Sequence, residues 1–80
     1  APSEVFSIYL STTEGASTVS DAALVGNEIL LVARTGSVYN ETTGTPSGRY
    51  FKFTSGTGTI TFDTAIPFNS GEDVYVEYKT

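Results

Sequence analysis

Apolar residues alternate with polar ones in short segments bounded by glycine, proline, serine and asparagine, and this pattern restricts the chain to a β fold. One further segment, residues 20–24, carries a capping residue before two alanines and a leucine, which predicts a single helical turn. Short strands at this spacing are typical of a β-sandwich or an open barrel. We expect an all-β fold, a small antiparallel β-sandwich (Ig-like or jelly-roll-like) of about six strands. The predicted strands are residues 5–10, 28–34, 37–41, 49–54, 59–63 and 74–79.

Two connections have the composition of tight turns. Thr35-Gly36 and the Ser-Gly-Thr-Gly run at residues 55–58 each separate consecutive predicted strands, so both predict β-hairpins. Residues 28–34 form the most apolar run, and we expect a central strand buried on both faces. Residues 11–20 are polar and contain a glycine, which predicts a loop.

The chain has 80 residues, which is enough for one domain over residues 1–80. Surface scaling predicts a folded surface of about 4,600 Å² and burial of about 60% of the unfolded surface. Leu24 and Val25 are expected to pack onto the core, and Ile66 and Phe68 to close one end of it. The alternation places the predicted core at Phe6, Ile8, Leu10, Leu30, Val32, Phe51, Phe53, Ile60, Phe62, Val74, Val76 and Tyr78.

The composition argues against an enzyme, because the chain contains no His and no Cys for acid–base, nucleophilic, zinc or haem chemistry. Lys52 and Lys79 alternate outward, so a Ser–Lys site is not expected. Nine acidic residues against four basic ones give a formal charge of −5, which opposes nucleic acid as a partner. No run approaches the roughly 18 apolar residues of a membrane helix, and residues 1–4 do not resemble a signal peptide. We therefore expect no cofactor, no membrane insertion and no secretion.

Three acidic residues near the last predicted strand are a candidate cation site. Glu72 and Asp73 are adjacent, and with Asp63 across the loop they would offer carboxylate oxygens to Ca²⁺. The spacing does not match an EF-hand, and adjacent acids in a glycine turn are usually solvated. We favour the solvated turn and predict no metal site.

The aromatic side chains outside the predicted core suggest a contact surface. Tyr9, Tyr50 and Tyr75 fall on the outward side of their strands, and Val38 and Tyr39 lie on a short hairpin. Tyrosine is enriched at protein–protein interfaces and also stacks on sugar rings. These five residues are the candidate interface, a sugar-binding surface is the alternative, and scattered surface tyrosines would need no function at all.

Three segments of the second half share one cadence: Gly58 to Phe62, Pro67-Phe68 and Gly71 to Tyr78. They resemble the closing segment of small β modules in tailed-bacteriophage structural proteins, such as head fibres, capsid decoration proteins and tail appendages. The earlier segments Leu24 to Val32 and Arg34 to Tyr39 fit the same picture. The resemblance covers most of residues 20–80 and brings no catalytic residues with it. It implies a non-enzymatic virion component that is often multimeric.

Together, these observations predict a virion structural or decoration protein that is made in the host cytoplasm. Its expected partners are copies of itself and other virion proteins. A domain this small gains stability by covering apolar surface between copies, so we expect a homo-oligomer. The resemblance implies a trimer. The alternative is a carbohydrate-binding or host-adhesion module, for which the partner is a host surface glycan.

Overall fold

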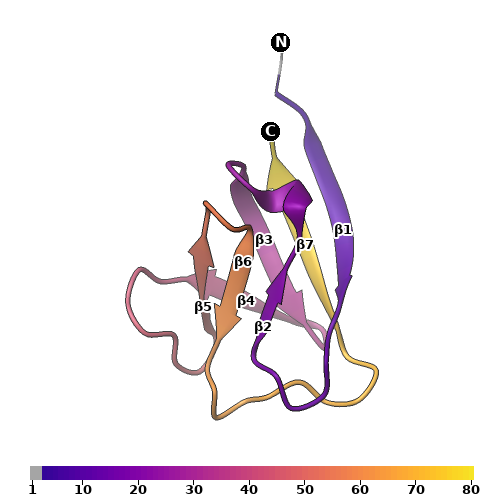
Figure 1. The fold of residues 1–80 in the computed structure, drawn as a ribbon, viewed down its shortest axis with the longest axis vertical. Coiled ribbons are helices and arrows are strands. Elements are labelled where there is room, and N and C mark those ends of the chain that lie inside the picture. Colours follow the sequence, from indigo (N-terminus) through magenta and orange to yellow (C-terminus); the bar gives the residue numbers. More distant parts are fainter. Residues whose placement is uncertain (1–2) are drawn as a thin grey trace.

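The computed structural model describes residues 3–80, which form seven strands and one turn of 3-10 helix (Figure 1). Strands make up 49% of residues 3–80 and helix 4%, which confirms the all-β prediction. The accessible surface of 4666 Å² agrees with the area predicted from length. The elements are β1 (Val5–Ser11), β2 (Thr18–Ser20), η1 (Ala22–Leu24), β3 (Glu28–Arg34), β4 (Ser37–Glu41), β5 (Tyr50–Thr54), β6 (Thr59–Phe62) and β7 (Asp73–Lys79).

The strand that the sequence did not predict is β2. It is only three residues long and lies at the end of the polar run that predicted a loop. Its pattern is exposed, buried, exposed, so one apolar side chain, Val19, faces the core. A single apolar residue among Ser and Thr does not form a recognisable alternation, because the pattern needs at least two inward positions.

All seven strands belong to one strongly curved sheet in the order β1-β7-β3-β4-β5-β6-β2. Five of its six strand pairs are antiparallel, but β4 and β5 are parallel, through Asn40 opposite Tyr50 and Glu41 opposite Phe51. The prediction of an entirely antiparallel sheet is therefore wrong at this pair. The loop between these strands folds back, so that β5 starts beside the end of β4 and runs in the same direction instead of forming a hairpin (Figure 1). The sheet nearly closes into a barrel.

The predicted hairpin at Thr35-Gly36 is confirmed, with Arg34 paired to Ser37 across a two-residue turn. Both turn residues have positive φ, 45° at Thr35 and 80° at Gly36. Two positive φ values are the signature of a type I′ turn, whose twist matches the twist of the two strands. Among residues 3–80, Thr35 is the one non-glycine residue with positive φ, so this turn is held against the preference of a β-branched side chain.

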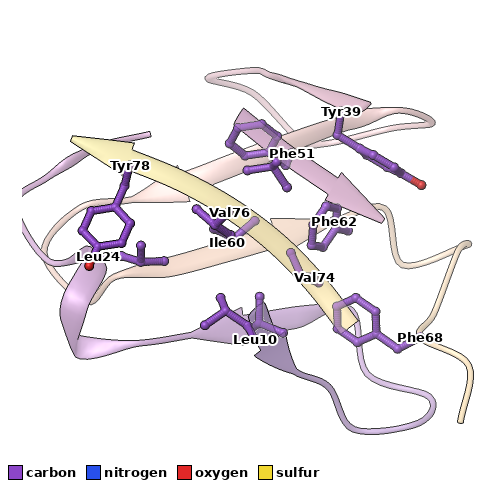
Figure 2. Close-up of a cluster of buried hydrophobic side chains, with 12 residues drawn as sticks. Leu10, Leu24, Tyr39, Phe51, Ile60, Phe62, Phe68, Val74, Val76 and Tyr78 are labelled. Atoms are coloured by element: carbon purple, nitrogen blue, oxygen red, sulfur yellow. The ribbon is translucent and has the colours of Figure 1, made fainter. Parts of the chain in front are cut away.

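The core fills the interior of the curved sheet (Figure 2). Phe62 contacts three other rings: it meets Tyr39 at 5.3 Å and Phe68 at 5.7 Å between centroids, both edge to face, and Phe51 at 6.5 Å. Phe68 closes the core as predicted, although it lies in a loop. The buried apolar residues are Leu10, Val19, Leu24, Val32, Tyr39, Phe51, Ile60, Phe62, Phe68, Val74, Val76 and Tyr78.

Two predicted core residues are exposed. Phe6 points inward from β1 but is 40% exposed, because the short strand β2 does not extend far enough to cover it. Leu30 is 44% exposed and lies at an irregularity in the β3–β7 register, where the strand's alternation shifts. Ile8 and Phe53 are half-buried and pack against the core.

Other expectations about burial are also wrong. Val25 and Ile66 are exposed, whereas their predicted companions in the core are buried. Strand β3 is not buried on both faces, since Leu31 and Ala33 on its outer side are half-buried and Glu28 is exposed. Among residues 3–80, no helix is long and apolar enough to cross a membrane.

The turn between β5 and β6 also anchors η1. Asp21 donates its backbone N–H to the carbonyl of Gly58 at 3.1 Å, and Gly26 donates to Ser55 at 3.2 Å. Gly58 has a φ of 64°, and a Cβ at this position would overlap the Asp21 carbonyl oxygen and press on Val25. Only glycine combines this backbone conformation with so close an approach.

Replacing Gly58 with Ala should therefore lower the free energy of unfolding by about 2 kcal/mol or more. Gly56 is the matched control, because it lies in the same turn, has no positive φ and faces open space. The change Gly56→Ala should alter stability by less than about 1 kcal/mol. Equilibrium urea unfolding of both variants measures the difference, and equal midpoints would contradict the packing described here.

Candidate functional site

Three of the five predicted interface residues lie in one row on the outer face of the sheet. Tyr9 on β1 is opposite Tyr75 on β7, Tyr75 is opposite Ala33 on β3, and Ala33 is opposite Val38 on β4. We refer to these four residues as the outer row. Tyr9 is 73% exposed and Val38 is 54% exposed, while the two between them are half-buried. The row crosses four adjacent strands without a charged residue.

The two tyrosines of the outer row pack against each other. Their ring centroids are 5.0 Å apart, with the ring planes tilted by 52°. The Tyr75 hydroxyl donates a hydrogen bond of 2.6 Å to Oε2 of Glu77. This bond raises the pKa of Tyr75, because ionisation would remove the donated proton and place two negative charges together. The hydrogen bond directs the Tyr75 hydroxyl toward Glu77.

Acidic groups lie on both sides of the outer row. Glu77 on β7 belongs to the neighbouring row, between Ser7 and Leu31, and Asp73 lies opposite Ser11 on the other side. Glu77 and Asp73 are two positions from Tyr75 in either direction along the strand. The outer row is therefore an uncharged aromatic and aliphatic strip with an acidic residue on each flank.

The other two predicted interface residues do not join the outer row. Tyr39 is 9% exposed and belongs to the core, so the prediction that it lies on the surface is wrong. Adjacent residues of a strand point to opposite faces, so Val38 on the outside requires Tyr39 on the inside, opposite Val32. Tyr50 is 47% exposed, as predicted, but lies on β5 opposite Asn40.

A buried ion pair that the sequence analysis did not predict lies at one end of the core. Arg34, the last residue of β3, is 2% exposed and donates from Nε to Oε2 of Glu72 at 2.9 Å. Its Nη2 donates to the Ile66 carbonyl at 3.1 Å. The guanidinium carbon lies 4.7 Å from the ring centroid of Phe62 and 4.6 Å from that of Phe68, so two aromatic faces enclose the charge.

Glu72 completes the arrangement from the loop before β7. Its carboxylate also accepts a hydrogen bond of 2.9 Å from the N–H of Asn69, and its carbonyl accepts one from the Thr12 hydroxyl. The hydrogen bond from Arg34 holds the pKa of Glu72 below its usual value, despite burial. The sequence contained one indication of the pair: Arg34 lies two residues after the inward-facing Val32 and so falls on the inner face of β3.

The three acidic residues considered as a cation site serve other purposes. Glu72 faces the interior, whereas Asp73 is exposed on β7. Asp63 accepts hydrogen bonds of 2.9 Å from the backbone N–H groups of Gly48 and Ala65, which hold the pKa of Asp63 below its usual value. Within residues 3–80 no three His, Cys, Asp or Glu residues gather as a metal site, and no pocket is present.

Comparison with known proteins assigns no family to the chain. No protein-family model, curated protein or solved structure matches it significantly.

Replacing Glu72 with Gln should lower the free energy of unfolding at pH 7 by about 3 kcal/mol, because it leaves the buried Arg34 charge unbalanced. The folded-state pKa of Glu72 is depressed, so its contribution is present above the unfolded value near 4.5 and is lost as pH falls through the folded pKa. The difference in free energy of unfolding between the wild-type protein and Glu72→Gln should therefore shrink below pH 4.5.

The neighbouring exposed acid provides the control for this measurement. The change Asp73→Asn removes the same charge one residue away, and it should change stability by less than about 0.5 kcal/mol. Chemical unfolding at several pH values between 3 and 7 measures all three proteins. A Glu72→Gln variant as stable as Asp73→Asn at pH 7 would show that the ion pair does not stabilise the fold.

Proposed function

We propose that the protein is a non-enzymatic structural module that self-associates through the outer face of β1, β7, β3 and β4. The observation that carries this proposal is the outer row: two tyrosines, an alanine and a valine in register across four strands. An uncharged strip with tyrosine at its centre has the composition of the middle of a protein interface, and the acidic flanks have that of a rim.

The geometry of the row also favours association with little loss of side-chain freedom. The Tyr75 hydroxyl is already bound to Glu77, and its ring packs against Tyr9. Side chains that are ordered before binding lose less entropy when the complex forms. The row lies on paired strands, so its backbone is also ordered in advance.

The net charge of −5 sets the condition under which copies associate. Like charges on two copies repel each other, and Asp73 and Glu77 lie beside the row. Salt screens exposed charges, with a Debye length of about 8 Å at 0.15 M. Association through the outer row should therefore strengthen as salt concentration rises, in contrast to an interface held by opposite charges.

A role as a virion component, with other virion proteins as partners, rests on the resemblance of most of residues 20–80 to small phage β modules. The same resemblance underlies the proposal of a trimer. The outer row supports self-association without setting the number of copies. Measurement of mass therefore tests both the interface and the trimer.

Sedimentation equilibrium at tens of micromolar protein in about 0.15 M salt should give a mass above that of one copy. The change Val38→Lys places a charge in the exposed end of the outer row and should weaken association by about tenfold or more. Thr54→Lys is the matched control, because Thr54 is exposed at the end of β5 and the substitution adds the same charge outside the row. A wild-type mass of one copy at several hundred micromolar would refute the proposal.

The second candidate function is carbohydrate binding. Tyr9 is 73% exposed, and its neighbour Tyr75 is hydrogen-bonded to the carboxylate of Glu77, so an aromatic surface and a hydrogen-bond acceptor lie together. A sugar ring can stack on an aromatic side chain while its hydroxyls donate hydrogen bonds to a carboxylate. Titration with a panel of glycans should then shift the NMR resonances of Tyr9 and Tyr75 saturably, and Tyr9→Ala should abolish the shifts. Their absence across the panel would leave self-association as the function of the row.

A further inference from the structure

The strand β1 lies at one end of the sheet and has a free edge. One side of β1 pairs with β7 over all seven residues, from Val5 opposite Lys79 to Ser11 opposite Asp73. Along its other side, no strand among residues 3–80 forms a ladder with it. Figure 1 shows β1 along the side of the molecule, with its N-terminal half extending past the end of β2. The sheet therefore stops at β1 without closing.

The hydrogen-bonding pattern identifies the backbone groups at this edge. The N–H of Thr80 donates to the carbonyl of Glu4 at 3.0 Å, just before the β1–β7 ladder begins. Bonded and non-bonded pairs alternate along an antiparallel ladder, so Phe6, Ile8 and Leu10 direct their backbone groups toward β7. The intervening residues direct theirs to the free edge, and these are Val5, Ser7, Tyr9 and Ser11.

The side chains at the same edge are incompletely covered. Phe6 points to the interior and stacks on Tyr78, with centroids 5.5 Å apart, yet it remains 40% exposed. Ile8, the next inward residue, is half-buried. Both lie on the side of the sheet where β2 is only three residues long. An additional strand beside β1 would cover the apolar surface that β2 leaves open.

The edge also lacks the features that usually prevent strand addition. Exposed edge strands in soluble proteins commonly carry lysine, proline or a β-bulge, each of which blocks pairing with another chain. The sequence from Val5 to Ser11 contains no charged residue, no proline and no glycine. Its register with β7 is uninterrupted, so no bulge turns the edge away.

We propose that the free edge of β1 pairs with β1 of a second copy, antiparallel, about a two-fold axis. A second copy suits this edge because each strand is uncharged over its paired length, so two proteins of charge −5 approach through a neutral segment. Each copy also covers apolar surface that β2 leaves exposed on the other, since its Phe6 and Ile8 extend the inner apolar face across the junction. In a two-fold arrangement, the same surface serves on both partners. The two curved sheets then continue into one another.

This inference deepens the proposed self-association by adding a surface distinct from the outer row. Strand pairing uses the backbone edge of β1, whereas the outer row uses side chains on the face of β1, β7, β3 and β4. A protein with two separate self-association surfaces can build an extended assembly, because each copy can bind partners in two directions.

Amide hydrogen exchange followed by NMR, at about 20 μM and about 500 μM protein, tests the pairing residue by residue. In the dilute sample, the amides of Phe6, Ile8 and Leu10 should exchange slowly and those of Val5, Ser7, Tyr9 and Ser11 rapidly. In the concentrated sample, the second set should slow by about tenfold or more, because their N–H groups then donate across the junction. Protection that alternates along β1 is specific to strand addition.

Two substitutions at one position separate the backbone from the side chain. Ser7→Pro removes a donor from the free edge, where proline is tolerated because the N–H has no partner within the protein. Ser7→Ala removes the side-chain hydroxyl and keeps the backbone N–H. The concentration-dependent protection at Val5, Tyr9 and Ser11 should disappear in Ser7→Pro and persist in Ser7→Ala. If the loss of slow exchange in β7 shows that Ser7→Pro has unfolded the protein, Ser7→Lys replaces it, since it places like charges across the two-fold axis.

The outcomes distinguish this proposal from the proposed function. If mass increases with concentration while Val5, Ser7, Tyr9 and Ser11 remain unprotected, β1 pairing is wrong and the outer row accounts for association. If the protection appears and persists in Val38→Lys, the β1 edge pairs independently of the outer row. A Ser7→Pro variant that keeps the fold and acquires the same protection overturns β1 pairing. A protein that stays monomeric at 500 μM overturns both proposals.

Discussion

A buried ion pair between Arg34 and Glu72 determines how the end of the sheet is closed. The guanidinium extends inward from the end of β3, lies between the rings of Phe62 and Phe68, and meets a carboxylate from the loop before β7. Removing both charges from water is unfavourable, so the arrangement depends on the surrounding hydrogen bonds, including the one from Asn69. These bonds hold the β6–β7 loop in its placement against the end of β3. That placement brings Phe68 into the core although it belongs to no strand.

The opposite side of the fold is less completely closed. Seven strands curve around the core, but β2 is short and β1 extends beyond it, so the ladder does not continue from one to the other. Phe6 remains partly exposed for this reason. The interior is thus sealed at the Arg34 end and open along β1, and both surfaces proposed for self-association include β1. An incomplete sheet of this kind leaves polar backbone groups and apolar side chains available to a partner.

Alternation along the strands predicted much of the candidate site. Tyr9, Val38 and Tyr75 lie on the outer face as expected. Each is adjacent in its strand to a residue that points inward, and adjacent residues of a strand point to opposite faces. The same alternation places Tyr39 on the inner face, because its neighbour Val38 points outward, so the prediction of Tyr39 as a surface residue was wrong. Alternation within one strand does not indicate which residues stand opposite one another. The alignment of the row depends on the β1–β7–β3–β4 registers, and the β1–β7 pairing joins residues more than sixty positions apart.

By itself, the sequence determined the all-β class, six of the seven strands, the two tight turns and most of the buried residues, since these follow from local alternation and turn chemistry. Only the tertiary structure decided the strand order, the parallel pairing of β4 with β5, and the partnership of Arg34 with Glu72. It also decided which apolar residues stay exposed, Phe6 and Leu30 among them. Those features depend on long-range contacts and on whether a neighbouring strand reaches far enough to cover a side chain. A pattern of period two specifies a face of a strand, but it does not specify what lies against that face.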